Sequence, residues 1–148
     1  MEGLTIRLYT PADRPEWQRM RDILFLGQTR EDMDSWLARD DSAVIVAERS
    51  GEGLCGFAEV GTRSFAEGCE SFPVAYLEGW YVDQDHRGKG VGKALVQAVV
   101  KWATARGFSE IASDTHVTNH TSQQAHERLG FVEVDRAVLY RKSLTPSG

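Results

Sequence analysis

Three alternating glycines, Gly88, Gly90 and Gly92, mark the segment of this sequence that is best able to do chemistry. They follow an apolar run at 74–82 and lead into an amphipathic helical pattern at 91–102. A glycine-rich turn that opens a helix lets backbone N–H groups approach an anion without Cβ interference. The helix dipole also favours negative charge at that end. The spacing therefore predicts a phosphate-binding turn.

Two common phosphate loops are excluded by spacing. The dinucleotide fingerprint requires a third glycine where Lys93 stands, and the nucleoside-triphosphate loop requires glycine and Ser or Thr where Arg87 and Ala94 stand. The remaining pattern is Arg87-x-x-Gly90-x-Gly92. It resembles the pyrophosphate loop of the GNAT N-acetyltransferases, a family that uses acetyl-coenzyme A.

A second motif follows in the order that this family shows. Asn119, Ser122 and His126 are spaced i, i+3, i+7 and so share one face of a helix, which ends with Leu129-Gly130-Phe131. This motif resembles the family's acetyl-CoA-contacting helix, and the resemblance extends over residues 54–142. Each motif alone supports the family moderately, and both together, in order on the predicted elements, support it strongly.

The resemblance implies a binding surface for acetyl-CoA, the expected cosubstrate. The strand before the loop is expected to pair with the pantetheine arm through its backbone, and the loop amides are expected to hold the pyrophosphate. The residues so implied are Trp80, Tyr81 and Val82 for the pantetheine arm, Arg87, Gly88, Lys89, Gly90, Val91, Gly92 and Lys93 for the pyrophosphate, and Asn119 and Ser122 on the second helix.

Two carboxylates favour a cationic substrate. Glu78 stands inside an otherwise apolar strand, where an isolated carboxylate costs several kcal/mol unless it is paired. Asp114 ends the neighbouring predicted strand, so the two acids could hold an ammonium group and help to remove its proton. The alternative is that Glu78 pairs with a structural arginine such as Arg136.

A more specific resemblance is to the aminoglycoside 6'-N-acetyltransferases, a bacterial antibiotic-resistance group. It rests on Phe65-x-x-Gly-Cys69, Leu77-Glu78-Gly79, Ala112-Ser-Asp-Thr115 and Tyr140-Arg-Lys142. The resemblance implies an aminoglycoside or another cationic amine as substrate, acetylated in the aminoglycoside case on its 6'-amine, and a homodimer.

The same group has differences from this sequence at the expected substrate cleft. Its members commonly carry Trp where Phe25 stands, Tyr where Phe65 stands and Glu where Asp135 stands. These replacements keep an aromatic wall and an acid, so they put the substrate range in question rather than the reaction. Phe25, Phe65 and Asp135 join Glu78 and Asp114 as the expected substrate-binding residues.

Glu78 and His126 are the expected catalytic residues. Glu78 is interpreted as the general base, acting directly or through water. His126 stands where many GNAT enzymes place a tyrosine that protonates the leaving thiolate; water or Tyr140 are alternative proton sources. Neither cysteine lies in a visible nucleophile–base arrangement, so direct attack of the amine on the thioester within a ternary complex is expected.

The elements predicted to position these residues define a mixed α/β fold. Strands are predicted at 4–9, 42–49, 54–60, 74–82, 108–114 and 131–142, and helices after Pro11 or Pro15 to Leu24 and at 30–38, 89–106 and 119–129. The GNAT-like α+β arrangement is a mostly antiparallel twisted sheet with a central βαβ unit and helices on both faces. One acetyltransferase domain is expected over residues 1–148.

Composition excludes little but agrees with a cytoplasmic enzyme. The net charge of -5 argues weakly against nucleic acid, and no apolar run approaches the length of a membrane span. No signal peptide is visible, and two cysteines without ligand spacing predict free thiols and no metal site. Alternative functions are a protein, peptide or polyamine N-acetyltransferase and a non-catalytic acyl-CoA sensor, the latter disfavoured by Glu78 and Asp114.

Overall fold

The chain divides into two compact units. The computed structural model describes residues 3–145, and the chain separates between Asp114 and Thr115. The first unit holds the sheet and most of the helices, and the second holds one helix and the C-terminal segment. The single domain expected over residues 1–148 stays a prediction.

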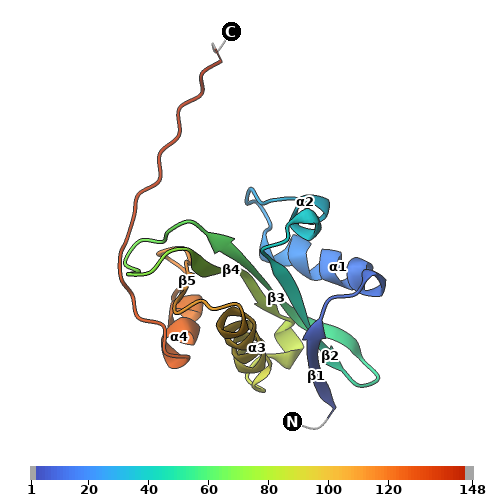
Figure 1. The fold of residues 1–148 in the computed structure, drawn as a ribbon. Helices are drawn as coiled ribbons and strands as arrows, with labels where there is room; N and C mark the ends of the chain where they lie inside the picture. Colours follow the sequence, from blue (N-terminus) through green and yellow to red (C-terminus); the bar gives the residue numbers. More distant parts are fainter. Residues whose placement is uncertain (1–2, 146–148) are drawn as a thin grey trace. The chain divides into compact units, whose positions relative to one another are not determined.

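A five-stranded sheet forms the centre of the first unit (Figure 1). Its strands are β1 (Leu4–Leu8), β2 (Ala43–Arg49), β3 (Gly53–Arg63), β4 (Val74–Val82) and β5 (Ile111–Ser113), in that spatial order. The first three pairings are antiparallel, and β4 and β5 are parallel. The parallel pair needs a crossover, which the helix between β4 and β5 supplies. The predicted mixed fold is confirmed.

Helices cover both faces of this sheet, as predicted (Figure 1). A 3-10 turn η1 (Pro11–Asp13), α1 (Arg14–Leu24) and α2 (Met33–Ala38) precede β2, while η2 (Gln84–His86) and α3 (Val91–Ala105) follow β4. Trp17, Met20 and Trp36 from α1 and α2 pack on one face of β2 and β3. Leu95 of α3 approaches Gly56 on β3 from the other helix layer. Strand β2 is buried along its middle because both faces are covered.

Strand β3 is longer than the sequence pattern predicts. The predicted strand ends at Val60, but the observed strand continues to Arg63, which pairs with Val74 at the start of β4. Because the added residues pair with β4, the extension depends on the neighbouring strand rather than on local apolar alternation. It carries Arg63 to the region of Glu78.

Strand β4 contains an irregularity at Glu78. Glu59 of β3 pairs with Gly79 and Val60 pairs with Leu77, so Glu78 is an extra residue in β4. A β-bulge of this kind bends the strand and re-aims a side chain, and bulges are over-represented beside active sites. The ladder between β4 and β5 also ends at Leu77, which pairs with Ser113, while β4 continues to Val82.

The second unit contains α4 (His120–Arg128), followed by a segment whose structure differs from the prediction. Residues 131–142, predicted as the final strand, form no strand. The side chains of 132–142 are exposed, with Val132 at 78% and Tyr140 at 91%. A β-strand is stable only when a neighbouring strand satisfies its backbone groups, and this unit contains no strand among its described residues to do so. The alternation of residue types in this segment was therefore not sufficient to predict a strand.

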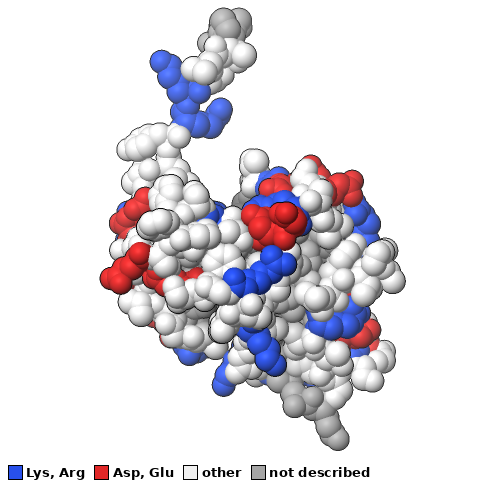
Figure 2. Space-filling model, viewed as in Figure 1, with Lys and Arg blue, Asp and Glu red and all other residues white. Residues whose placement is uncertain are grey.

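Many arginines of the described surface form ion pairs with carboxylates. On the face shown in Figure 2, acidic and basic side chains lie beside one another. Arginine–carboxylate pairs among the described residues include Arg19–Asp83 at 2.9 Å and Arg39–Asp41 at 3.1 Å. Among residues 3–145, no helix is long and apolar enough to cross a bilayer. Cys55 and Cys69 form no disulfide with each other.

Candidate active site

Glu78 is held by an arginine that the sequence did not single out. Nε and Nη2 of Arg63 donate to the two carboxylate oxygens of Glu78, at 2.9 and 2.8 Å. The hydrogen bond to Glu78 raises the pKa of Arg63, despite the opposing effect of burial. Within the first unit, Glu78 thus has a structural arginine as its partner, and this arginine is Arg63. Arg136 belongs to the second unit, where its Nε donates to Glu133 at 2.6 Å.

Asp114 is linked to the same group through Tyr76. The Tyr76 hydroxyl donates to Asp114 Oδ2 at 2.6 Å, and the guanidinium carbon of Arg63 lies 3.5 Å from the centre of the Tyr76 ring. Burial, with the hydrogen bond to Asp114 as a second cause, raises the pKa of Tyr76, so the hydroxyl stays protonated and continues to donate. The two predicted carboxylates therefore belong to one cluster, which we call the cation cluster: Arg63, Tyr76, Glu78 and Asp114.

Phe25 lies beside the bulge that carries Glu78. It follows α1, and its ring atom Cζ is 3.2 Å from the position that a Cβ on Gly79 would take. A side chain at position 79 would crowd this ring, which would have to shift by a few tenths of an ångström. Phe65 lies on the connection between β3 and β4 and is 66% exposed. The structure thus places one of the two predicted aromatic residues against the strand that bears Glu78.

The loop between β3 and β4 is fixed by a carboxylate that sequence reasoning missed. Glu110, immediately before β5, accepts hydrogen bonds from the backbone N–H groups of Glu70 and Ser71, at 2.9 and 2.6 Å, and from the Ser71 hydroxyl. The Ser71 hydroxyl is the largest cause that lowers the pKa of Glu110. The loop is therefore anchored at its C-terminal part, on the edge of the sheet where Asp114 lies.

The glycine turn has the backbone geometry expected of an anion site. Gly90 caps α3 in the left-handed conformation, with φ of 86°, and the helix begins without a side-chain cap. The first-turn N–H groups of a helix have no intrahelical partner, so a cap or a ligand is needed to satisfy them. The Val91 side chain is buried, at 1% exposure, so only its backbone can serve a ligand. These features fit a pyrophosphate group.

Gly92 has a different role from the other two glycines. A Cβ at this position would lie 3.3 Å from Trp80 Cζ2, and Trp80 Nε1 donates to the Gly92 carbonyl at 3.2 Å. The glycine therefore lets the indole of β4 pack closely against the start of α3. This contact explains why Trp80 and Gly92 belong together, and it fixes the angle between strand and helix.

Arg87 is directed back onto β4. Its Nε donates to the Val82 carbonyl at 2.8 Å, and its guanidinium carbon lies 5.7 Å from the centre of the Tyr81 ring. Tyr81 is buried, and its hydroxyl donates to Asp83 at 3.0 Å. The side chains of Tyr81 and Arg87 therefore stabilise the end of the strand. The ligand contacts predicted for these two residues are left to their backbone groups. Lys89 and Lys93 are exposed beside the turn.

The helix residues of the second motif are connected to one another. Asn119 caps α4 by accepting from the Ser122 N–H at 3.1 Å, and His126 Nδ1 lies 2.7 Å from the Ser122 carbonyl. A carbonyl only accepts, so this contact places the proton on Nδ1. The His126 ring also packs edge-on against Phe131, with ring centres 5.2 Å apart. Asp135 is exposed in the same unit and accepts from the Arg136 N–H.

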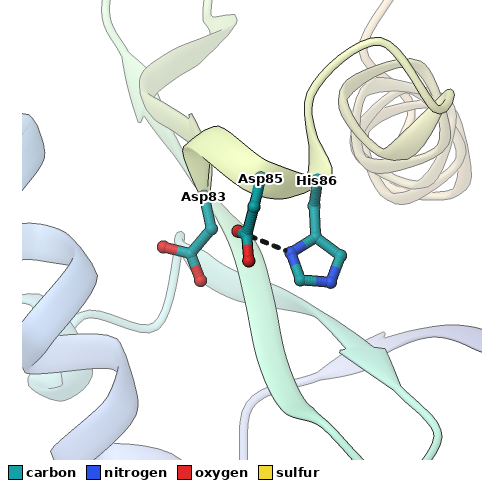
Figure 3. A group of neighbouring side chains, drawn as sticks. All are labelled: Asp83, Asp85 and His86. Atoms are coloured by element: carbon teal, nitrogen blue, oxygen red, sulfur yellow. Dashed lines mark hydrogen bonds and ion pairs between the residues drawn. The ribbon is translucent and has the colours of Figure 1, made fainter.

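A small acidic and histidine group lies between β4 and α3. The ligand-type atoms of Asp83, Asp85 and His86 lie within 4.8 Å of one another (Figure 3). Asp83 already accepts two hydrogen bonds from Arg19, at 3.0 and 2.9 Å, and His86 Nδ1 lies 3.0 Å from Asp85. The group is satisfied by protein partners and gives no reason to assign a metal.

Comparison with known proteins places this geometry in a family. The model of the acetyltransferase (GNAT) family matches residues 6–131, which is most of the chain. The chain belongs to the GNAT family. This GNAT protein is also similar to curated relatives over nearly its whole length, and both the glycine turn and the cation cluster lie inside the matched range.

Two relatives and two solved structures illustrate the likeness. The aminoglycoside N(6')-acetyltransferase type 1 of Stenotrophomonas maltophilia is 40% identical, over 97% of this chain and 95% of the relative. The protein of the same name from Klebsiella aerogenes is 41% identical, over 94% and 96%. AAC(6')-Iy in complex with a bisubstrate analogue, CoA-S-monomethyl-acetylneamine, is 35% identical, with a TM-score of 0.86 over 95% and 98%. AAC(6')-Ih from Acinetobacter baumannii is 28% identical, with a TM-score of 0.87 over 97% and 100%.

Proposed function

We propose that this protein transfers the acetyl group of acetyl-CoA to the 6'-amine of an aminoglycoside and so acts as a resistance enzyme. The observation that carries the proposal is the cation cluster beside the β4 bulge. It places two carboxylates and an aromatic face together beside β4, the strand that leads into the glycine turn. The relatives of known name support the substrate class. The bisubstrate complex of AAC(6')-Iy supports the pairing of coenzyme A with an aminoglycoside.

The acetyl-CoA site is assigned to backbone groups. The amides from Arg87 to Lys93 hold the pyrophosphate at the uncapped start of α3. The β4 backbone at Trp80, Tyr81 and Val82 pairs with the pantetheine arm, beyond the point where the ladder with β5 ends. Asn119 and Ser122 contact the cofactor from α4. Acetyl-CoA supplies an activated acyl group as a thioester, and the protein supplies position and proton transfer.

The roles of the cation cluster follow from its chemistry. Glu78 and Asp114 attract the ammonium groups of the substrate, and Phe25, Phe65 and Asp135 complete the substrate surface. The reacting ammonium loses one proton, to Glu78 directly or through water, because only the neutral amine is nucleophilic. The amine nitrogen then forms a bond to the acetyl carbon, while the carbon–sulfur bond breaks. His126 gives a proton from Nε2, in the doubly protonated form of the ring, to the departing thiolate, and the amine nitrogen releases its second proton to water.

Oligomeric state and location belong to the same proposal. We assign a cytoplasmic homodimer of single-domain chains, each of which encloses one acetyl-CoA site. The exposed Val134, Leu139 and Tyr140 support a dimer, because an extended segment with apolar side chains gains stability by pairing with another chain. Light scattering coupled to size exclusion tests this assignment. A monomer at micromolar concentration contradicts it.

A thiol-release assay tests the function. Acetyl-CoA is offered with kanamycin, with an aminoglycoside that bears a 6'-hydroxyl, with spermidine and with a lysine peptide. We expect turnover with kanamycin and little with the 6'-hydroxyl compound, and mass spectrometry should locate the acetyl group on the 6'-nitrogen. Acetylation at another amine, or preference for spermidine or the peptide, overturns the assignment.

A paired glycine substitution tests the cosubstrate site by calorimetry. Gly90→Val should weaken acetyl-CoA binding strongly, because a β-branched residue both strains a φ of 86° and blocks the amides. Gly107→Val is the matched control, since Gly107 has a similar φ of 87° at the other end of α3 and open space around it. Equal affinity of the two folded variants would remove the glycine turn from the site.

A further inference from the structure

The guanidinium group of Arg63 lies where the ammonium group of the substrate is expected to bind. Its guanidinium donates to both oxygens of Glu78 and stacks 3.5 Å from the centre of the Tyr76 ring. Tyr76 in turn donates to Asp114. A carboxylate, an aromatic face and a second carboxylate are the groups by which proteins recognise an ammonium ion. In this structure Arg63 already engages two of these three groups.

This arginine is accessible enough to move. Arg63 is 45% exposed and Glu78 is 24% exposed, so water and a polar ligand reach both partners. Arginine–carboxylate pairs at this exposure are only weakly favourable, because solvent competes with the partners and ordering of the side chains costs entropy. The Arg63 side chain extends from the last residue of β3, where the sheet gives way to a loop. Opening of the pair therefore requires no rearrangement of the core.

We propose that Arg63 is an intramolecular placeholder that occupies the ammonium subsite at Glu78 and is displaced by the 6'-ammonium of the substrate. This inference rests on the proposed function and adds a residue that sets apparent affinity. Arg63 keeps Glu78 paired while the site holds no substrate, which avoids an unpaired carboxylate beside the apolar part of β4. The substrate must supply enough favourable contacts to replace it.

Competition of this kind has a defined signature. Every ligand that needs Glu78 binds less tightly by the same factor, because the binding-competent state is only a fraction of the population. A ligand that bears a hydroxyl in place of the 6'-ammonium has no charge with which to replace Arg63, so it carries no such penalty. Removal of Arg63 should therefore increase the affinity for the 6'-amine compound more than the affinity for the 6'-hydroxyl compound.

The experiment measures dissociation constants by calorimetry, without acetyl-CoA, for kanamycin and for its 6'-hydroxyl counterpart. Arg63→Gln should tighten kanamycin binding about fivefold to tenfold, the range expected for one solvent-accessible bidentate pair with a stacked ring. Binding of the 6'-hydroxyl compound should change less than twofold. Arg63→Lys, which keeps the charge but loses the planar two-point contact, should lie between wild type and Arg63→Gln.

Two controls separate local competition from general charge. Arg14→Gln removes the same charge from an arginine of similar exposure, 42%, which is paired with the more exposed Asp34. It should leave kanamycin binding unchanged. Arg63→Gln should also have no effect on kanamycin binding when Glu78→Gln is already present, because the contested carboxylate is then absent.

The outcomes distinguish the two proposals. Wild-type protein that neither binds nor acetylates kanamycin overturns the proposed function and the placeholder with it. Wild-type protein that acetylates kanamycin, together with a folded Arg63→Gln variant that binds it equally or more weakly, overturns the placeholder alone. Equal tightening by Arg63→Gln and Arg14→Gln also overturns it, because net charge then accounts for the effect.

Discussion

Two arginine–glutamate pairs of the first unit have the same chemistry and opposite surroundings. Arg21 of α1 donates to both oxygens of Glu59 at 2.7 and 3.1 Å, and Trp17 donates to the same carboxylate at 3.1 Å. Arg21 and Glu59 are 2% and 1% exposed, whereas Arg63 and Glu78 are 45% and 24% exposed. The two glutamates lie close in the ladder, because Glu59 pairs with Gly79, the residue after Glu78.

The difference in exposure gives the two pairs different roles, structural for the buried pair and functional for the exposed pair. A buried ion pair is held by the cost of leaving either charge unpaired in a low-dielectric interior. A half-exposed pair can exchange its partner for water or for a ligand at small cost. The buried pair therefore fixes α1 against β3, beneath the bulge, and the exposed pair remains available for chemistry. Four predictions test this division, beginning with the largest expected effects on catalysis and on stability.

Glu78→Gln should lower kcat for kanamycin by a factor on the order of 10² to 10⁴, the usual cost of losing a general base. Loss of the titrating group should also flatten the acid limb of the pH–rate profile. The free energy of unfolding should change by less than about 1 kcal/mol, because the pair is solvent-accessible. Wild-type turnover at every pH would exclude Glu78 as the base and leave water or His126.

Glu59→Gln, the same substitution in the buried pair, should cost about 3–5 kcal/mol of unfolding free energy, because it leaves Arg21 as a buried charge without its counter-ion. Urea denaturation followed by tryptophan fluorescence measures this loss. The comparison is sharp because Glu78→Gln is its matched control. Similar destabilisation by both variants would mean that exposure does not distinguish the two pairs.

Asp114→Asn should chiefly raise the aminoglycoside KM, by roughly tenfold, with a smaller effect on kcat. The KM of the variant should also depend less on salt than that of the wild type, because one attractive charge is missing. Asp34→Asn, in the exposed pair with Arg14, is the control and should leave KM unchanged. A loss confined to kcat would instead place Asp114 in proton transfer.

A third pair, Arg7–Asp13, lies between the two extremes, with the arginine 29% and the aspartate 8% exposed. The hydrogen bond from Arg7 is the largest cause that lowers the pKa of Asp13 to about 2 from the usual 3.8. A depressed folded-state pKa gives stability that is present above pH 3.8 and lost as the pH falls through 2.

Asp13→Asn should therefore cost about 2 kcal/mol at pH 7, a value obtained from that shift. The difference in unfolding free energy between wild type and variant should stay constant from pH 7 to 5 and shrink below pH 4. Urea titrations at several pH values measure it. A difference that grows as the pH falls would have the wrong sign for this pair.

The sequence predicted the parts of the site that depend on local spacing. The turn at Gly88 and Gly90, the helix that follows it and the helix after Asn119 are all set by residues near in sequence, and each lies close to its predicted place. The apolar run at 74–82 likewise gave β4 with its correct bounds, because a strand buried on both faces needs a continuous apolar pattern. In the structure the strands lie side by side in their order along the chain, an arrangement that short connections favour.

Tertiary structure decided what depends on residues far apart in the chain. Nothing in the local pattern distinguishes Arg63 from other arginines; it becomes the partner of Glu78 because β3 extends along β4 and the bulge displaces Glu78. Burial likewise separates the Glu59 pair from the Glu78 pair, and it arises only when α1 covers β3. The strand expected at 131–142 failed for the same reason, since its alternating residues fix which side chains share a face but cannot provide the backbone partner that makes a strand.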